Sequence, residues 1–204
     1  MEFVQRNSWG KLVASVLIAT VCHNDILEVY NADACSSLQD NLFLPETHPS
    51  SSSSAMAWMF TNNTCNPLLA DTTSCTLGNY VSYAFNATTA NDVREAVVFD
   101  NLFNIRLVIR ATGHDYNGKS TGAGALSVWT HHLKSISLDD SYKSSAYTGK
   151  AATIGADVRS LEAYEFANAN NGIIVGGNCP TVALAGSYSQ GGGHSPYHKI
   201  WPGG

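Results

Sequence analysis

The pattern of hydrophobic and polar residues predicts alternating strands and helices from residue 80 onward. Residues 80–85 alternate between two faces, as the residues of a half-buried strand do. A helix capped by Thr89 or Asn91 follows, because apolar residues then recur at helical spacing. A second strand over 105–109 leads into a loop rich in glycine and polar residues.

The pattern continues beyond this loop. It predicts short strands over 126–129, 136–138 and 152–155, and a helix near 158–168. Gly172 stands where a glycine closes a helix. The apolar residues 173–175 read as one more strand, which leads into a second glycine-rich loop. The layout is mixed α and β and favours the α+β class, with two strands that each lead into a glycine-rich loop.

The region before residue 75 is less regular. Its Pro and Ser residues predict a loop over 45–55, and the chain before that loop reads as an irregular arm. The apolar run 12–21 has two interpretations, the core of a signal peptide or a buried strand rich in β-branched residues. We therefore predict an N-terminal arm over 1–74 and one domain over 75–204.

Composition excludes two classes of partner. The 204 residues are 44% hydrophobic and 13% charged, which is typical of a chain that folds around a core. Eleven Lys and Arg against 16 Asp and Glu give a net charge of −5, whereas proteins that bind nucleic acids concentrate basic residues. The longest apolar run is shorter than the roughly 20 residues that span a bilayer. We expect neither a nucleic-acid partner nor a membrane-spanning helix.

Five cysteines bear on the compartment. Four form two closely spaced pairs, and bridges such as Cys22–Cys35 and Cys65–Cys75 would persist in an oxidising compartment. Glycosylation acceptors at Asn62 and Asn86 favour the same compartment. The alternative is four reduced, buried thiols in a cytosolic protein. Cys179 is the odd cysteine and needs a separate explanation.

The first glycine-rich loop contains a phosphate-loop pattern. Residues 113–120 read Gly-His-Asp-Tyr-Asn-Gly-Lys-Ser and follow a predicted strand, as in nucleotide hydrolases. In those enzymes a helix begins at the Lys-Ser pair, whereas here Gly122 and Gly124 disfavour a helix. A non-helical loop still binds anions through successive backbone N–H groups. A nucleotide hydrolase therefore remains only a minor alternative.

Other local motifs fail. A lone histidine such as His114 is most often a solvated or hydrogen-bonded side chain. Cys179 has no neighbouring cysteine with which to form a zinc or redox motif. A Gly-x-Ser-x-Gly elbow around Ser189 fails because Ser187 occupies its first glycine position. His131 and His132 are adjacent and make poor co-ligands. We expect no metal site.

Taken together, the two loops resemble those of the berberine-bridge-enzyme-like flavin oxidases, within the vanillyl-alcohol-oxidase superfamily. The resemblance rests on segments 109–120, 176–182 and 190–194, and extends to 75–83 and 124–133. It implies a PCMH-type FAD-binding domain of two α/β subdomains. It also implies covalently attached FAD. His114 would bond to the 8-methyl carbon of the flavin, and Cys179 would bond to C6, an attachment found in many members of the family.

The resemblance implies further cofactor-binding residues around the two attachment points. In the first loop these are Arg110, Thr112, Gly113, Asp115, Gly118 and Ser120. In the second loop they are Pro180, Thr181, Val182, Gly186, Gln190, Gly191, Gly192, Gly193 and His194. Small residues let the backbone approach the ring and the pyrophosphate closely.

The function implied is that of a secreted oxidase. Such an enzyme takes a hydride from an alcohol, sugar or amine carbon of a small molecule and passes the electrons to O2. Family members are much longer, so we expect this domain to be incomplete at its C-terminus, and residues 197–201 match nothing in the family. No residue is assigned as the catalytic base. The alternative is a non-catalytic remnant that binds flavin weakly or does not fold.

Overall fold

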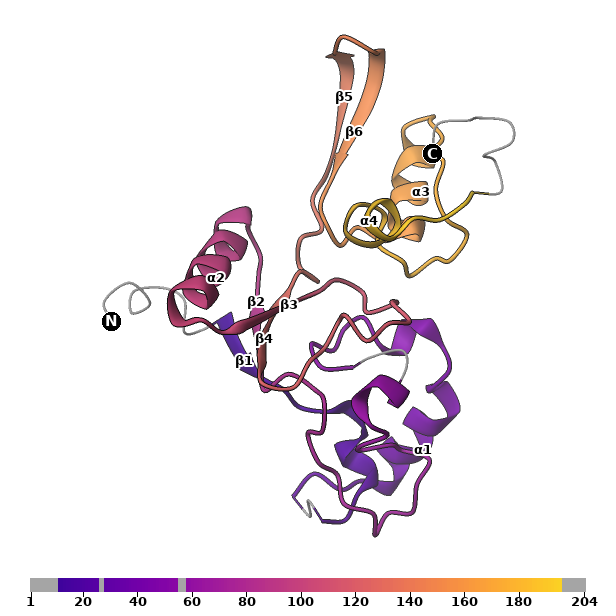
Figure 1. Ribbon diagram of the computed structural model, residues 1–204. Coiled ribbons are helices and arrows are strands. Elements are labelled where there is room, and N and C mark those ends of the chain that lie inside the picture. Colours follow the sequence, from indigo (N-terminus) through magenta and orange to yellow (C-terminus); the bar gives the residue numbers. More distant parts are fainter. Residues whose placement is uncertain (1–10, 26–27, 55–57, 196–204) are drawn as a thin grey trace. The chain divides into compact units, whose positions relative to one another are not determined.

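The computed structural model describes residues 11–25, 28–54 and 58–195 (Figure 1). The expectation about residues 197–201 lies outside these ranges. The chain forms two compact units, Met1–His131 and His132–Gly204, which are described separately. Within the described ranges, no helix is long and apolar enough to cross a membrane.

Unit 1 contains a four-stranded sheet. Its order is β1 (Leu12–Ala14), β2 (Tyr83–Asn86), β4 (Ala125–Trp129) and β3 (Arg106–Arg110). The strands β2, β4 and β3 are parallel, and β1 is antiparallel to β2. All five residues of β4 are buried, as expected for a central strand covered on both faces. The predicted strands over 80–85, 105–109 and 126–129 are confirmed to within a few residues.

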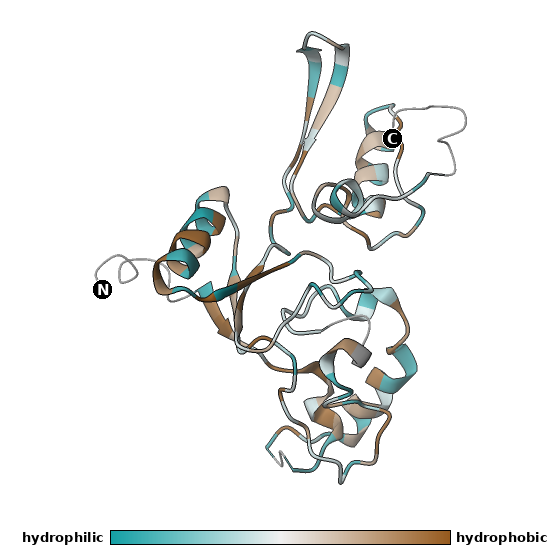
Figure 2. Ribbon diagram, viewed as in Figure 1, coloured by the Kyte–Doolittle hydropathy of each residue, from teal (hydrophilic) through white to brown (hydrophobic). Residues whose placement is uncertain are grey.

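Helix α2 (Ala90–Phe103) covers one face of this sheet. Thr89 is its N-cap and forms a capping box with Asp92, so of the two proposed caps the structure selects Thr89. Ala96 packs with Phe85, Ala87 and Val128 of the sheet region. Figure 2 shows hydrophobic and hydrophilic residues alternating around this helix.

The N-terminal region of unit 1 is more regular than the expected arm. Of the apolar run 12–21, only β1 is a strand, and its other end lies in a 3-10 helix, η2 (Ile18–Cys22). Three helical segments follow, α1 (Ala32–Asn41), η3 (Pro45–Thr47) and η4 (Trp58–Thr61). Short helices with mixed faces carry a weak periodic signal, which is why the sequence pattern missed them.

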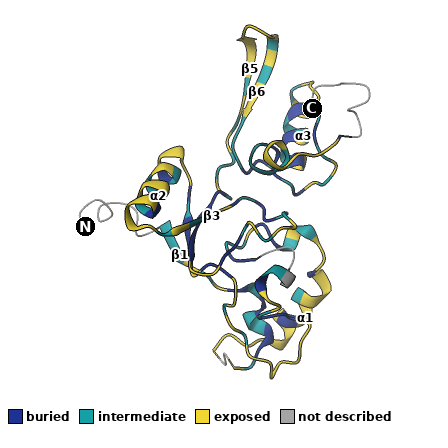
Figure 3. Cartoon of the chain, viewed as in Figure 1, coloured by how far each residue is buried: buried dark blue, intermediate teal, exposed yellow. Residues whose placement is uncertain are grey.

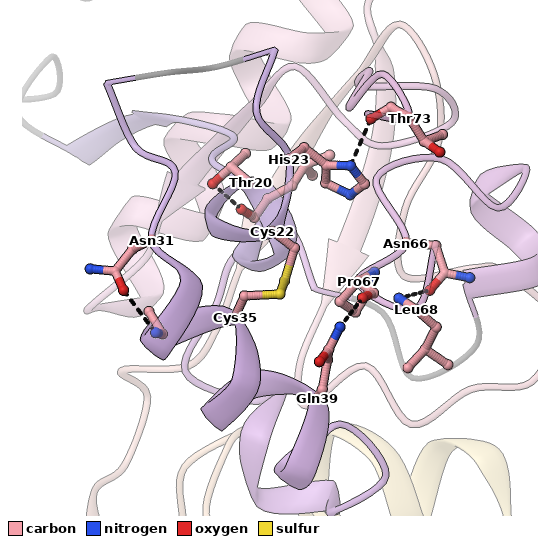
Figure 4. The surroundings of a disulfide bond; sticks show 12 residues. Thr20, Cys22, His23, Asn31, Cys35, Gln39, Asn66, Pro67, Leu68 and Thr73 are labelled. Carbon is pink, nitrogen blue, oxygen red and sulfur yellow. Dashed lines mark hydrogen bonds between the residues drawn. A yellow bond between two sulfur atoms is a disulfide. The ribbon is translucent and has the colours of Figure 1, made fainter. Parts of the chain in front are cut away.

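Two disulfides hold this region together, Cys22–Cys35 and Cys65–Cys75, as expected from the spacing. Figure 4 shows the first of them between η2 and α1. Near it Gln39 donates a hydrogen bond to the carbonyl of Pro67, at 2.6 Å. The bridges compensate for a small local core, which consists of Leu17, Ala19, Cys65 and Tyr80.

Unit 2 combines a hairpin with helices. Strands β5 (Ile136–Lys143) and β6 (Thr148–Ile154) are antiparallel, and α3 (Ser160–Ala169) follows them. A π-helical turn, η5 (Leu184–Tyr188), continues into α4 (Ser189–Gly191). The core consists of Val158, Ala163 and Leu184, with partly buried residues packed around them. Figure 3 shows that much of the hairpin is exposed.

The structure corrects three expectations in unit 2. Residues 173–175 are not a strand, because no strand pairs with them among the described residues, and Ile173 is 77% exposed. Gly172 is not the left-handed residue after α3: Asn170 is the C-cap and Asn171 adopts that conformation at φ 53°, while the Gly172 N–H donates to the carbonyl of Ala167 at 2.8 Å. The hairpin strands are longer than predicted because their outer residues are polar and exposed. The η5–α4 turn was not predicted.

The predicted loop over 45–55, which the structure describes as far as residue 54, is partly buried. His48, Pro49, Ser53 and Ser54 are almost inaccessible to solvent. His48 Nε2 lies 2.8 Å from the carbonyl of Leu42, and Nδ1 lies 2.6 Å from Ser54 Oγ. The carbonyl accepts only, so Nε2 carries the proton and the Ser54 hydroxyl donates to Nδ1.

We predict that His48 makes the stability of unit 1 sensitive to acid. Burial lowers the pKa of His48; the hydrogen bond to the Leu42 carbonyl offsets part of this effect, and the Arg110 guanidinium adds a smaller lowering. The folded state therefore binds fewer protons than the unfolded state, and stability falls as the pH drops below about 6.5. Urea unfolding from pH 7.5 to 5 is expected to show a smaller pH dependence for His48→Gln than for the parent. His132→Gln, at an exposed histidine, keeps the parental slope; an equal slope in His48→Gln contradicts the prediction.

A second prediction concerns Asp100 on α2. The side chain is 3% exposed, neither carboxylate oxygen has a hydrogen-bond partner, and burial raises its pKa to about 6. The folded state prefers the protonated form, so this contribution to stability is lost as the pH rises through 6. Asp100→Asn is expected to stabilise the protein by about 1–2 kcal/mol at pH 7.5 and by little at pH 4, as measured by urea unfolding.

The matched control is Asp92→Asn on the same helix. Burial opposes ionisation of Asp92, but the Lys11 ion pair at 2.5 Å and hydrogen bonds from Thr88 hold its pKa well below the usual range. This variant is expected to lose stability at pH 7.5. Equal destabilisation of Asp100→Asn at both pH values overturns the assignment.

Candidate functional site

The first glycine-rich loop begins where β3 ends. Gly113, Gly118 and Gly124 have positive φ values of 80°, 67° and 71°, a region that side chains with a Cβ rarely adopt. A Cβ on residue 113 would lie 2.3 Å from Arg110 Nη1, so only glycine fits there. The carbonyl of Arg110 accepts a hydrogen bond from Thr130 N at 2.9 Å, which fixes the start of the loop.

Asp115 closes this loop from within. One carboxylate oxygen accepts the backbone N–H of Lys119 at 2.6 Å, and the other accepts the hydroxyl of Ser120. Asp115 and Ser120 thus brace the loop internally. No helix begins at Lys119 or Ser120, so the loop lacks the helix N-terminus on which the nucleotide-hydrolase interpretation depends.

His114 lies at the centre of the loop and is half-buried, next to the buried Thr112. Gly113 is buried as well, and its φ of 80° turns the chain between Thr112 and His114. The turn therefore holds His114 between the buried start of the loop and its more exposed middle.

The second loop lies across the start of α3 in unit 2. The carbonyl of Pro180 accepts from Leu161 N at 3.2 Å, and that of Val182 accepts from Ser160 N at 2.9 Å. Cys179 is half-buried and unbridged, and its Sγ lies 3.6 Å from the hydroxyl of the buried Thr181. These anchors hold the thiol in one place at the edge of the loop.

Tyr164 of α3 supports the same loop. Its hydroxyl donates a hydrogen bond to the carbonyl of Gly177, and burial raises the pKa of this phenol. A Cβ on Gly176 would lie 2.8 Å from both Tyr164 Oη and Leu184 Cδ2, so a larger residue there would displace these side chains. An aromatic residue at helical spacing is typical of a core position, so the sequence pattern did not indicate that Tyr164 supports the loop.

A cavity of about 340 Å³ adjoins this loop. It is lined by α3 and the chain that follows it, namely Tyr164, Ala167, Asn168, Gly172, Ile173, Ile174, Gly176, Gly177, Asn178 and Ser195.

An ion pair lies near the N-terminus of α3, at Glu162. Burial opposes ionisation of Glu162, but Arg159 and Lys134 lower its pKa to about 2. A permanent ion pair therefore stabilises the helix that supports the loop.

The glycine run 191–193 lies after η5 and α4. The N–H of Gly186 donates to the carbonyl of Ala156 at 2.8 Å, which fixes the start of this segment. No atom lies within 4 Å of a Cβ placed on Gly191 or Gly192, so the backbone is openly accessible there. Gln190 and His194 are exposed beside it.

The predicted site residues therefore fall into two groups. Arg110, Thr112, His114, Asp115 and the neighbouring loop residues lie together in unit 1. Cys179, Pro180, Thr181 and the residues that follow lie in unit 2. The prediction that His114 and Cys179 bond to the same flavin ring stays a prediction.

Comparison with known proteins identifies the family. The family model described as "FAD binding domain" matches residues 81–199. The chain is 48% identical over 186 residues to the FAD-linked oxidoreductase ZEB1 of Gibberella zeae, covering 91% of this chain and 32% of that protein. It is 46% identical over 187 residues to the VAO-type flavoprotein oxidase VAO615 of Thermothelomyces thermophilus, covering 91% and 33%.

Solved structures agree with these relatives. The VAO-type flavoprotein MtVAO615 from Myceliophthora thermophila C1 matches with a TM-score of 0.90 at 44% identity, covering 94% of this chain and 35% of that chain. MtVAO713 from the same source matches with a TM-score of 0.81 at 32% identity, covering 96% and 36%. The fold is thus that of VAO-type FAD-binding domains. The chain spans about a third of the length of these relatives.

The described residues fit FAD. Each loop carries, among small residues, a side chain that becomes a nucleophile when deprotonated, His114 or Cys179. The bare backbone at Gly191 and Gly192 leaves room for a large planar or phosphate group. Because the family model matches more than half of its residues, this chain belongs to the FAD binding domain family, and it is similar to VAO-type FAD-linked oxidoreductases.

Proposed function

We propose that this chain holds covalently attached FAD as the flavin-binding part of a secreted oxidase. The observation that carries the proposal is the pair of glycine-rich loops, each of which holds one half-buried nucleophilic side chain, His114 or Cys179. The relative named as a VAO-type flavoprotein oxidase supports oxidase chemistry. When bound, FAD accepts a hydride from an alcohol, sugar or amine carbon, and O2 is the final electron acceptor.

The two attachments follow the same chemistry. A nitrogen of His114 bonds to the 8-methyl carbon, and the sulfur of Cys179 bonds to C6. Each new C–N or C–S bond would replace a C–H bond of the flavin and the N–H bond of the imidazole or the S–H bond of the thiol. The two protons and two electrons released would pass through the ring to O2, which would become hydrogen peroxide. The residues of this chain supply the nucleophiles in neutral imidazole and thiolate form.

The surrounding residues orient these nucleophiles. Asp115 and Ser120 hold the first loop closed, and Tyr164 holds the second through the Gly177 carbonyl. Rigid loops keep a reacting nitrogen or sulfur near its carbon without reorganisation. We assign no residue of this chain to substrate binding or to the role of catalytic base.

Covalent attachment is tested by mass spectrometry. After incubation with FAD and acid precipitation, the parent protein is expected to retain yellow flavin in the pellet. Trypsin releases His114 in peptide 111–119 and Cys179 in peptide 160–199, and each is expected to carry the flavin mass. His114→Ala removes the first linkage and Cys179→Ala the second, whereas His132→Ala at an exposed site changes neither. A colourless parent pellet with unshifted peptides sinks the proposal.

Secretion and glycosylation give a separate prediction. Asn62 is exposed in a turn, whereas Asn86 is half-buried at the end of β2, and its Thr88 hydroxyl is tied to Lys11 and Asp92. We expect a glycan on Asn62, whose amide nitrogen loses a proton and displaces the lipid diphosphate of the oligosaccharide donor. In a secreting host, Asn62→Gln is expected to abolish the glycosidase-sensitive shift on a gel, and Asn86→Gln to keep it. The reverse pattern contradicts this choice.

A further inference from the structure

Arg110 is a buried cation at the end of β3, with 1% of its surface exposed. Its Nε donates to the carbonyl of Ser51 at 3.1 Å, and Nη2 donates to the carbonyl of His48 at 3.1 Å. These partners lie about 60 residues earlier in the chain, in the buried loop 48–54. The planar fork of a guanidinium suits two acceptors at fixed positions.

The other side of the guanidinium faces the turn that precedes His114. Nη1 occupies the space that a Cβ of residue 113 would need, at 2.3 Å, and Gly113 has a φ of 80°. The backbone of Arg110 is fixed as well, because its carbonyl accepts from Thr130 N. The side chain therefore fills the gap between loop 48–54 and the turn at Gly113.

Loop 48–54 is built to present its carbonyls. The imidazole of His48 is held between Leu42 and Ser54, as described above. Ser51 Oγ accepts the N–H groups of Ser53 and Ser54, at 3.3 and 3.2 Å. The N–H of Ser51 points back to the carbonyl of His48 at 3.3 Å. These bonds fix the two oxygen atoms that receive Arg110.

We propose that Arg110 is a positioning residue rather than a cofactor ligand, and that loop 48–54 sets the conformation of the His114 loop through it. The connection runs from Ser54 and His48 to Arg110 and from Arg110 to Gly113. Its consequence for flavin attachment rests on the proposed function, but the connection itself is a property of the flavin-free chain. Arg110 thereby couples the disulfide-bonded N-terminal region to the flavin loop.

Limited trypsin cleavage of the flavin-free protein tests the connection. Arg110 is itself a trypsin site, and cleavage after it requires the end of β3 and the following turn to open. Ser54→Ala and His48→Gln, which leave Arg110, the backbone carbonyls that bind it and the residues of the turn in place, are expected to raise cleavage after Arg110 by about tenfold. Cleavage after the exposed Lys143 and Lys150 in unit 2 serves as the internal reference and stays constant.

The matched control is Ser52→Ala in the same loop. Ser52 Oγ lies 3.4 Å from Ser53 Oγ and makes no contact with His48 or Arg110, so this variant is expected to behave as the parent. Two variants are used so that a folding defect in one, seen by circular dichroism, leaves the other informative. Unchanged cleavage after residue 110 in the folded variants overturns the proposal.

Arg110→Lys separates positioning from charge. Lysine keeps the positive charge and remains a trypsin site but cannot reach two carbonyls as a fork. The proposal expects cleavage after residue 110 to rise as in His48→Gln, with a matching fall in the fraction of covalent flavin after incubation with FAD. If the residue acted only as a charge beside the pyrophosphate, Arg110→Lys would show parental cleavage, and that result rejects the proposal. Loss of covalent flavin in every protein, parent included, counts against the proposed function alone.

Discussion

The buried Arg110 guanidinium is the interaction on which the first glycine-rich loop depends. It has 1% of its surface exposed, so its N–H groups need acceptors within the protein. Its Nε and Nη2 donate to the carbonyls of Ser51 and His48, and its Nη1 lies in the space that a Cβ of residue 113 would need. The turn before His114 therefore lies against a fixed cation. This turn belongs to a domain whose family binds FAD.

The two units use different means to hold their loops. In unit 1 the Asp115 carboxylate ties the far end of the loop, and the buried Arg110 guanidinium occupies the space beneath the turn. In unit 2 a helix lies under the loop, and its Tyr164 and Ser160 bond to loop carbonyls. Glycine is required in both units because a polar side chain stands where a Cβ would lie. Small residues therefore serve the packing of the protein as well as the approach of a cofactor.

Segment 113–120 shows how a short motif misleads and how the structure corrects it. Its letters satisfy a phosphate-loop pattern, but the Lys119 N–H that would start a helix is bonded to Asp115 instead. Asp115 and Ser120, which the resemblance placed among the cofactor-binding residues, turn toward each other. Their role in bracing the loop is seen in the structure, and their contact with the flavin stays a prediction.

The sequence by itself determined the order of strands and helix over residues 80–129, the capped start of α2, both disulfides and the two loops with His114 and Cys179. These features depend on local periodicity, on caps and on spacing along the chain. Only the tertiary structure decided that loop 48–54 is buried, that its carbonyls receive Arg110, that Tyr164 supports Gly177, and that 173–175 is not a strand. Each of these depends on partners far apart in the chain, and hydrophobic patterns carry no information about which distant group a buried polar atom will find.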